Sequence, residues 1–371
     1  MKKILLMYIS KDSGHHMASL AIEKALHLQT NDIETLNVNS FNYTNPILEK
    51  IINKTYMSVI RRKPEVWGYL YDNPKIVKKT QKLRDSIHKH NAEKLKNLLT
   101  SFCPDAVACT QAFPCGMIAD YKKTFNVKLP LFGVLTDYAP HSYWIYDKVN
   151  TYFVPSKETG QRLINNGVSA DRVIETGIPV DPIFKTAKDR SKIYGKIGLL
   201  KDKPTILLTG GSQGMGPLKE IFLSLVKTKT DFQIITVTGK NRSMFKWFKA
   251  QEKKSRKKLI TFAYIDNVDE LMEIATVLIS KPGGITTAEA FAKGLPLCII
   301  KPIPGQEQMN ADYLLSNKAA VKIEQPLNAG VIIEELLYNQ DKLTELNTKS
   351  REFSRPDSAL KIASFILKQI R

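Results

Sequence analysis

Cysteine is scarce in this chain, whose 371 residues include only Cys103, Cys109, Cys115 and Cys298. None belongs to a CxxC pair, and no histidines cluster beside them. Structural zinc sites need such spacings, so we do not expect a bound zinc ion. The pattern instead predicts reduced thiols in the core of a cytosolic protein.

Long apolar runs are also missing. No segment approaches the ~20 apolar residues that a membrane-spanning helix needs. At the N-terminus, two lysines are followed by only six apolar residues before Ser10. That run is too short for the apolar region of a signal peptide, and we interpret it as a first buried strand. We therefore expect a cytoplasmic chain without a transmembrane segment.

Acidic residues are outnumbered: 36 aspartates and glutamates stand against 55 lysines and arginines, a formal net charge of +19. Between Lys50 and Lys96 there are thirteen basic and four acidic residues, and between Lys240 and Lys258 there are nine and one. Such an excess attracts a nucleic acid or an anionic phospholipid surface. No RRM, KH, zinc or helix-turn-helix signature accompanies it, so charge alone supports the nucleic-acid alternative.

The common nucleotide-binding signatures GxGxxG and Walker A are absent as well. The chain instead alternates strand and helix patterns, which predicts an α/β fold with parallel sheets. Strands are predicted at residues 3–9, 33–38, 105–109, 131–135, 151–154, 173–176, 205–208, 232–237, 258–262, 275–279 and 297–300. The clearest later helices are predicted at residues 157–166, 217–228, 268–274, 285–293, 306–316, 330–338 and 356–370.

Two domains are expected, because the length exceeds the ~250–300 residues at which one core stops growing. The stiff connection Gly177–Pro182 marks their boundary. We assign residues 1–180 and 181–355 to the domains and residues 356–371 to a C-terminal helix, with packing against the N-terminal domain as one option. Both domains begin strand, glycine turn, helix, with Gly14 in the first and Gly210–Gly214 in the second. Two doubly wound domains that face each other would enclose a cleft.

The segment Ser280–Asn310 holds the densest set of informative residues. A strand pattern precedes a turn at Gly283 and Gly284, and a helix pattern follows it. Such a turn presents unpaired N–H groups and the positive end of a helix dipole, which together receive phosphate. Glu289 in the next turns suits ribose hydroxyls. The plain alternative is a tight turn in which Glu289 only favours the helix N-terminus.

Several blocks match known proteins in their order along nearly the whole chain. In the first half they are SGHHMASLAIEKAL (13–26), LTDYAPHSYWIYDKVNTYFVPS (135–156) and TGIPVDPIF (176–184). In the second half they are LLTGGSQGMGPL (207–218), TGKN (238–241), YIDNVDELM (264–272) and the segment 281–314. Together they resemble the GT-B glycosyltransferases of family 28, above all the monogalactosyldiacylglycerol synthases and processive diacylglycerol glucosyltransferases. The resemblance implies two Rossmann-like domains facing a cleft.

The resemblance also implies that the C-terminal domain binds UDP-glucose or UDP-galactose as a substrate, without a separate cofactor. The matching residues are Ile265 for uracil, Glu289 for ribose, Gly211, Ser212, Gly283, Gly284 and Thr286 for the pyrophosphate, and Gln306, Glu307 and Asn310 for the sugar. Carboxylates and amides offer directional hydrogen bonds to a polyol. No DxD metal motif occurs at a strand end, so helix dipoles and N–H donors would stabilise the leaving UDP without a metal.

The N-terminal domain would bind the acceptor, diacylglycerol. In an inverting transfer the attacking hydroxyl must lose its proton, and a histidine or a carboxylate can accept it. His15, in the family's Gly14-His15 pair, and Asp137, at a strand end, both suit this role, and the sequence leaves the choice open. The neighbouring His16 departs from the family's single histidine.

Two more groups match the acceptor side. His141 and Trp144 fit the family's pattern after the aspartate and would shape the acceptor pocket. The basic span between Lys50 and Lys96 includes Arg61, Arg62, Lys63 and Trp67. Aromatic rings suit a lipid interface and cations suit anionic headgroups. We therefore expect peripheral association with the inner face of the cell membrane.

The sequence thus predicts an inverting hexosyltransferase that moves glucose or galactose from a UDP-sugar to diacylglycerol. One alternative is the lipid-linked N-acetylglucosaminyltransferase of peptidoglycan synthesis, which shares much of the C-terminal pattern. A sugar-nucleotide epimerase of the same fold would not need lipid-facing features. A basic nucleic-acid-binding protein is the alternative of another class. The sequence does not specify the sugar, the number of sugars added or the oligomeric state.

Overall fold

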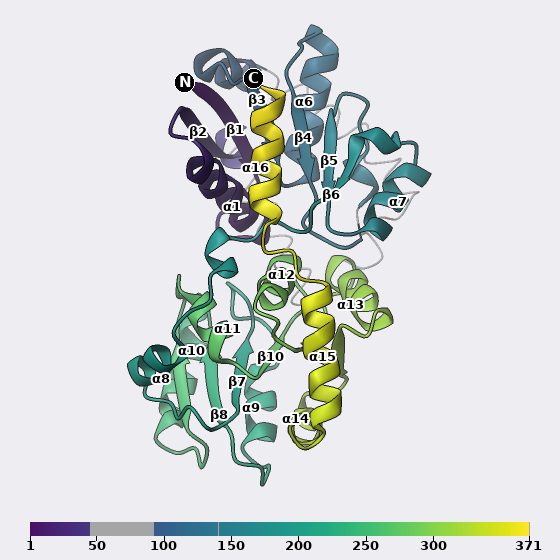
Figure 1. The fold of residues 1–371 in the computed structure, drawn as a ribbon. Coiled ribbons are helices and arrows are strands. Elements are labelled where there is room, and N and C mark those ends of the chain that lie inside the picture. Colours follow the sequence, from purple (N-terminus) through teal and green to yellow (C-terminus); the bar gives the residue numbers. More distant parts are fainter. Residues whose placement is uncertain (45–92, 140, 371) are drawn as a thin grey trace. The chain divides into compact units, whose positions relative to one another are not determined.

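The computed structural model describes residues 1–44, 93–139 and 141–370. They form two compact units, each with its own six-stranded parallel sheet (Figure 1). The first unit comprises Met1–Pro182, Ile303–Met309 and Pro356–Arg371, and the second comprises Ile183–Pro302 and Asn310–Arg355. The predicted α/β class with parallel sheets is confirmed. In the described part of the chain, no helix is both long and apolar enough to cross a membrane.

The sheet of the first unit has the strand order β2-β1-β3-β4-β5-β6. Its strands are β1 (Lys2–Tyr8), β2 (Ile33–Asn39), β3 (Ala106–Cys109), β4 (Leu131–Val134), β5 (Thr151–Val154) and β6 (Val173–Glu175). All neighbouring pairs are parallel. Every residue of β3, β4 and β5 is buried, as expected for central strands that helices cover on both faces.

Side chains alternate between the two faces of this sheet. In β1, Leu5 and Met7 join one apolar cluster, and Ile4 and Leu6 join the other. The first face is covered by α6 (Ala112–Phe125) and by helical residues 93–102, and the second by α1 (Gly14–Gln29) and α16 (Ser358–Gln369). The unit also contains α2 (Ser40–Thr44), α7 (Lys157–Asn165), η1 (Ser142–Trp144) and η2 (Ala170–Arg172).

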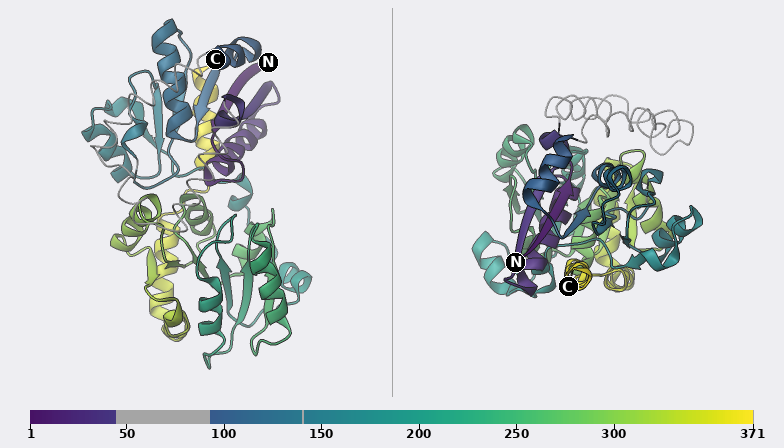
Figure 2. Two further views of the ribbon diagram at one scale, coloured as in Figure 1. Left: turned by 180° about the vertical axis from the view of Figure 1, so that it is seen from behind. Right: turned by 90° about the horizontal axis from the view of Figure 1, so that it is seen from above.

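The C-terminal helix α16 belongs to the first unit although it follows the whole second sheet in sequence. Ala359, Ile362, Ala363 and Ile366 repeat at helical spacing and are buried in the same cluster as α1. Ser358 Oγ donates a hydrogen bond to the carbonyl of Ile178 over 2.6 Å. α16, coloured yellow, runs beside α1 (Figures 1 and 2). A late amphipathic helix therefore completes the first core.

The sheet of the second unit has the strand order β12-β11-β10-β7-β8-β9. Its strands are β7 (Thr205–Thr209), β8 (Gln233–Val237), β9 (Leu259–Phe262), β10 (Val277–Ser280), β11 (Leu297–Ile300) and β12 (Ala320–Ile323). The helices are α8 (Arg190–Ile197), α9 (Leu218–Leu225), α10 (Arg242–Glu252), α11 (Val268–Ile274), α12 (Gly284–Ala292), α13 (Gln306–Ser316), α14 (Ala329–Tyr338) and α15 (Gln340–Glu352), with η3 (Pro182–Lys185) and η4 (Pro326–Asn328). The start of α13, up to Met309, and Pro182 of η3 belong to the first unit.

All four cysteines are free, but they are not all in the core. Cys109, Cys115 and Cys298 are buried, whereas Cys103 is exposed, so the expectation of a core thiol is wrong there. Cys103 follows the helical residues 93–102 in a left-handed conformation with a φ of 52°. The helix ends before the thiol can reach the sheet.

Each sheet has one point where the direction of strand addition reverses. In the first unit this point lies between β1 and β3, and in the second it lies between β7 and β10. The segments that leave two such strands diverge to opposite sides of the sheet. In open α/β sheets, ligands bind in the crevice that this divergence leaves at the carboxyl ends of the strands.

Candidate active site

The crevice of the first unit begins where β1 ends. The chain turns through Ser10–Ser13, and α1 starts at Gly14. Ser13 is the N-cap of this helix, and its hydroxyl accepts the amide hydrogen of His16 over 3.3 Å. The cap fixes the start of α1, so that His15 lies in its first turn at the carboxyl end of the sheet.

His15 is held from the ends of two other strands. Thr110, directly after β3, donates its hydroxyl to the carbonyl of His15 over 2.8 Å. Thr136, shortly after β4, has its Oγ1 2.9 Å from Nδ1 of the His15 ring. The bond at Nδ1 orients the ring and leaves Nε2 for the proton of a substrate.

The protonation of His15 follows from its surroundings. Burial lowers the pKa of His15 below its ordinary value, while the Asp137 carboxylate and a bond from the ring to the main chain of Thr110 act in the opposite direction. The imidazole is therefore neutral at neutral pH. A neutral imidazole is the form that accepts a proton.

His16 has a different environment from its neighbour. Its ring stacks on Tyr8 with the ring centroids 4.2 Å apart. Its Nδ1 accepts the backbone amide hydrogen of Asp12 over 3.2 Å. These contacts brace the turn before α1, so the two adjacent histidines differ in their contacts, and His15 is the one beside Asp137.

Asp137 lies three residues after β4 and is half-buried. Gln306, the first residue of α13, donates an amide hydrogen to its Oδ2. The segment Ile303–Met309, which carries Gln306, belongs to the first unit. Glu307 accepts the amide hydrogen of Ile303 over 2.9 Å, which closes the turn before α13. The sequence had associated Gln306 with the sugar alone, and the structure adds a contact with a candidate base.

His141 and Trp144 lie on the chain that follows Asp137. His141 is half-buried, stacks on Tyr143 with centroids 4.3 Å apart, and accepts the amide hydrogen of Tyr143 at Nδ1 over 3.1 Å. Trp144 is 7% exposed and belongs to the core cluster of the first unit. Trp144 therefore packs in the core beneath this loop, and its place in the acceptor pocket stays a prediction.

In the second unit, the loop that follows β7 folds back on itself. The amide of Met215 donates to the carbonyl of Gly210 over 3.0 Å. The turn after β8 is tied to this loop: Lys240 N donates to Ser212 O over 2.8 Å, and Asn241 Nδ2 donates to Gly214 O over 3.1 Å. The two segments therefore form one layer at the carboxyl ends of β7 and β8.

Glycine is required where these two segments touch. A Cβ atom at Gly214 would lie 1.9 Å from the carbonyl oxygen of Thr238, and one at Gly239 would lie 2.3 Å from that of Ser212. Gly214 and Gly239 also have positive φ values of 57° and 54°. Only glycine adopts this conformation without strain and permits such a close approach. The glycines thereby fix Gly211 and Ser212 at the end of β7.

Helix α12 starts four residues after β10. Its N-cap is Gly283, which has no side chain to bond the first N–H groups of the helix. A Cβ atom at Gly283 would meet no atom within 4 Å, so the turn faces open space. Thr286 and Glu289 are three residues apart on the half-buried side, whereas Thr287 and Phe291 are buried. This arrangement suits an anion at the helix end, with a hydroxyl and a carboxylate one turn further on.

Three other residues that the sequence predicts to bind the UDP-sugar lie at separate places in the second unit. Gly284 is buried at the first position of α12. Asn310 is fully buried and donates its Nδ2 to the carbonyl of Pro282 over 3.1 Å. Ile265 follows β9 at the edge of the sheet, two strands from β7. Asn310 thus braces the glycine turn, a contact that its assignment to the sugar did not foresee.

Four predicted acceptor-side residues lie outside the described residues: Arg61, Arg62, Lys63 and Trp67. Conversely, the sequence analysis assigned no role to Thr110, Thr136 or Asn241. Each of these follows a buried strand within a few residues. These residues could have been found from the sequence, because polar side chains directly after a parallel strand lie where ligands bind in such folds.

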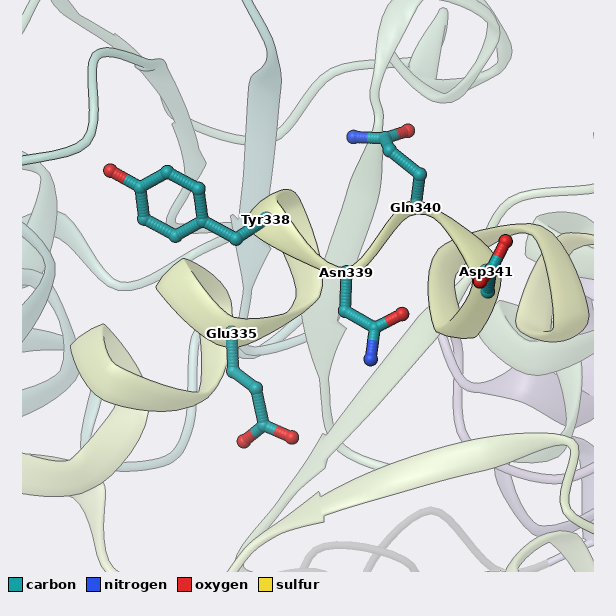
Figure 3. Close-up of a pocket in the computed structure, with 5 residues that line it drawn as sticks. All are labelled: Glu335, Tyr338, Asn339, Gln340 and Asp341. Carbon is teal, nitrogen blue, oxygen red and sulfur yellow. The ribbon is translucent and has the colours of Figure 1, made fainter.

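A hollow of about 550 Å³ lies elsewhere in the second unit and is lined by Glu335, Tyr338, Asn339, Gln340 and Asp341 (Figure 3). Asn339 caps α15 by accepting the amide hydrogen of Lys342 over 3.0 Å. Gln340 points away from Glu335 and Asn339 in Figure 3. A ligand site needs polar groups that converge, so we place one candidate site at the switch point of each sheet instead.

The chain is similar in sequence to known lipid glycosyltransferases. Residues 15–180 match the family profile of monogalactosyldiacylglycerol (MGDG) synthase, and residues 205–365 match that of the glycosyltransferase family 28 C-terminal domain. Over 369 residues the chain is 31% identical to the processive diacylglycerol beta-glucosyltransferase of Bacillus cytotoxicus, covering 99% of this chain and 94% of that protein.

Solved structures share the fold. MurG of Acinetobacter baumannii superposes with a TM-score of 0.66 at 17% identity, covering 99% of this chain and all of that one. MnaA of S. aureus, solved with UDP, gives a TM-score of 0.66 at 18% identity and covers 100% and 97% of the two chains. The predicted GT-B fold class is confirmed by these similarities.

Proposed function

Because the chain belongs to the diacylglycerol glycosyltransferases of family 28, we propose that it transfers a hexose from a UDP-sugar to diacylglycerol and so makes a membrane glycolipid. The observation that carries this proposal is the group at the first switch point, where His15 is oriented by Thr136 beside Asp137. Glucose is the favoured hexose, since the relative from B. cytotoxicus is named a glucosyltransferase.

The second unit would hold the donor. β10 and β7 are adjacent, so the N-terminus of α12 and the loop of Gly211 and Ser212 lie at the same end of the sheet. Main-chain N–H groups from both suit a diphosphate. Glu289 would accept the ribose hydroxyls, and MnaA supplies an example of UDP bound to this fold. The UDP-sugar is a substrate, and the proposed chemistry uses no further cofactor.

The proposed reaction inverts the configuration of the sugar. The acceptor hydroxyl attacks the anomeric carbon opposite UDP, so that the new C–O bond forms while the bond to the phosphate oxygen breaks. Nε2 of His15 takes the proton of the attacking hydroxyl. The Asp137 carboxylate stabilises the resulting imidazolium, since its charge favours the protonated ring. Amides and the helix dipole stabilise the charge that develops on the leaving UDP.

Product analysis tests the function directly. We expect the purified protein to convert radiolabelled UDP-glucose and diacylglycerol vesicles into lipid-soluble label, with the β-anomer as product. UDP-galactose in a parallel reaction identifies the preferred hexose, and UDP-N-acetylglucosamine with a polyprenyl-linked acceptor serves as the control for MurG-type chemistry. Absence of labelled diacylglycerol glycolipid from both hexose donors would contradict the proposal.

A prediction for the donor site concerns Glu289. Replacing Glu289 with Gln keeps its size but removes the charge, and we expect UDP affinity to fall by about 10- to 100-fold through loss of charge-assisted hydrogen bonds to the ribose. Isothermal titration with UDP measures this loss. Glu345→Gln, at an exposed position of α15, is the control for removing a carboxylate from the same unit and should leave UDP affinity unchanged. Equal affinity of wild type and E289Q would disprove the ribose assignment.

Peripheral membrane association forms part of the proposal. Diacylglycerol resides in the bilayer, so the protein must reach a membrane surface to use it. The basic and aromatic composition of residues 50–96 suits the inner face of the cell membrane. The likeness to MurG concerns the fold alone at 17% identity, so we do not propose a peptidoglycan reaction.

A further inference from the structure

The second unit carries a row of cations that the proposed chemistry does not use. Arg242, Lys246, Lys249 and Lys253 follow one another along α10 and its C-cap at steps of four, three and four residues, and all are exposed. Residues with this spacing lie on one side of a helix. We call these four residues the α10 basic face.

The opposite side of α10 is anchored in the core. Phe248 is fully buried, and its ring lies 5.4 Å from that of Phe222 in α9. The ring of Trp247 lies 5.9 Å from that of Phe222, and Met244 packs against the same cluster. This packing fixes the rotation of α10 about its own axis, so the α10 basic face is directed towards solvent.

Among the described residues, a carboxylate pairs with only one cation of the α10 basic face, Lys249. Glu252 is the sole acidic residue of the sequence between Lys240 and Lys258. Its Oε1 accepts the amide hydrogen of Thr261 over 2.6 Å and also pairs with Lys249 at 2.9 Å. This carboxylate is therefore turned towards β9.

The remaining cations of the face are unpaired. Within the ranges that the structure describes, Arg242, Lys246 and Lys253 take part in no ion pair. Three more exposed cations follow the helix: Lys254, Arg256 and Lys258. Like charges that lie close together without counter-ions repel one another, and this repulsion lowers the stability of the folded state. Binding of an anionic partner would reduce the repulsion.

We propose that the α10 basic face binds the anionic surface of a phospholipid bilayer. The choice of partner rests on the proposed function, because the acceptor is a bilayer lipid. Phe245, half-exposed beside the row with its ring 5.8 Å from Lys249 Nζ, supplies an apolar group suited to the interface. Seven of the nine cations in residues 240–258 are lysines, which act as point charges and lack the bidentate phosphate grip of arginine. This composition favours a lipid surface over a nucleic acid.

The test measures partition into vesicles of phosphatidylcholine with and without phosphatidylglycerol. Each cation near an anionic surface contributes about fivefold to the partition coefficient. The triple variant Arg242→Gln, Lys246→Gln, Lys253→Gln is expected to lower partition into the anionic vesicles by at least about tenfold, and to leave partition into neutral vesicles unchanged. Glutamine matches lysine and arginine in helix propensity, so α10 should remain folded.

A matched control distinguishes the effect of the α10 basic face from the effect of lowering the net charge of the protein. The variant Lys123→Gln, Lys128→Gln, Lys227→Gln removes three exposed charges elsewhere, and its vesicle affinity should stay within about twofold of wild type. Equal losses in the two variants, or no loss in the α10 variant, would overturn the proposal. A gel-shift assay with single-stranded RNA covers the other partner: loss of RNA affinity without loss of vesicle affinity would also overturn it.

The outcome is independent of the catalytic proposal. Partition is measured without donor sugar, and activity is measured separately on diacylglycerol dispersed in neutral detergent. The α10 variant should keep wild-type activity in detergent and lose activity on anionic vesicles. A wild-type protein that binds anionic vesicles through α10 but forms no glycolipid in either assay would contradict the proposed function and leave the α10 proposal standing.

Discussion

Replacing His15 with alanine should lower the turnover number by about 100- to 10,000-fold, the usual contribution of a general base. UDP affinity should be unchanged, because His15 belongs to the first unit and the residues proposed to bind UDP itself belong to the second. The matched control is His16→Ala. In the wild type, the His16 ring stacks on Tyr8 and accepts a hydrogen bond from the turn before α1. We expect that variant to keep turnover within a few-fold of wild type, with thermal unfolding measured for both.

The pH dependence distinguishes His15 from Asp137 as the base. Burial lowers the folded pKa of His15, so the active neutral form persists as pH falls below 6.5 and is lost only as pH falls through that lowered pKa. Wild-type kcat/KM should therefore have an acid limb below pH 6.5.

The variant Asp137→Asn completes this test. It removes the carboxylate that raises the pKa of His15, so the acid limb should move to still lower pH while the maximal rate falls. If Asp137 is the base instead, D137N should lose nearly all activity and H15A should retain most of it. Measuring kcat/KM against pH for the three proteins decides between the two residues.

Replacing Gly239 with alanine should disrupt the layer that holds the proposed pyrophosphate site. The added Cβ would lie 2.3 Å from the carbonyl oxygen of Ser212 and 2.6 Å from that of Gly211, at a φ of 54°. Backbone strain of this kind costs about 1–3 kcal/mol in the free energy of unfolding. Displacement of Gly211 and Ser212 should also lower UDP affinity at least about tenfold, as expected for one lost charge-assisted hydrogen bond.

Gly195→Ala is the matched control for this change. Gly195 lies inside α8, and a Cβ atom there meets no atom within 4 Å. Alanine should stabilise the helix by about 0.5–1 kcal/mol and leave UDP affinity unaltered. Chemical denaturation and UDP titration measure both quantities. If G239A had the same stability and UDP affinity as the wild type, the two loops would not be packed as described.

Local patterns in the sequence predicted most of the elements. All eleven predicted strands are present, with β5 and β11 at the predicted bounds, and α11 and α13 also match. These segments combine a clear apolar period with a glycine or polar boundary. The edge strand β12 was missed because two of its four residues are only half-buried, and one of them is Lys322. α10 was missed because its charges obscured the spacing of Met244, Trp247 and Phe248.

The sequence alone determined that two strand–glycine turn–helix repeats exist, and its motif blocks identified the family to which the chain belongs. Apolar periodicity and glycine turns involve only a few consecutive residues, so they can be recognised in the sequence without knowledge of the fold. The tertiary structure decided which of two histidines faces Asp137, that Thr110 and Thr136 hold it, and that Asn310 supports the turn before α12. These outcomes depend on strand order and on side-chain contacts between residues up to 121 positions apart. Such contacts form only when the strands pair, so local sequence does not encode them.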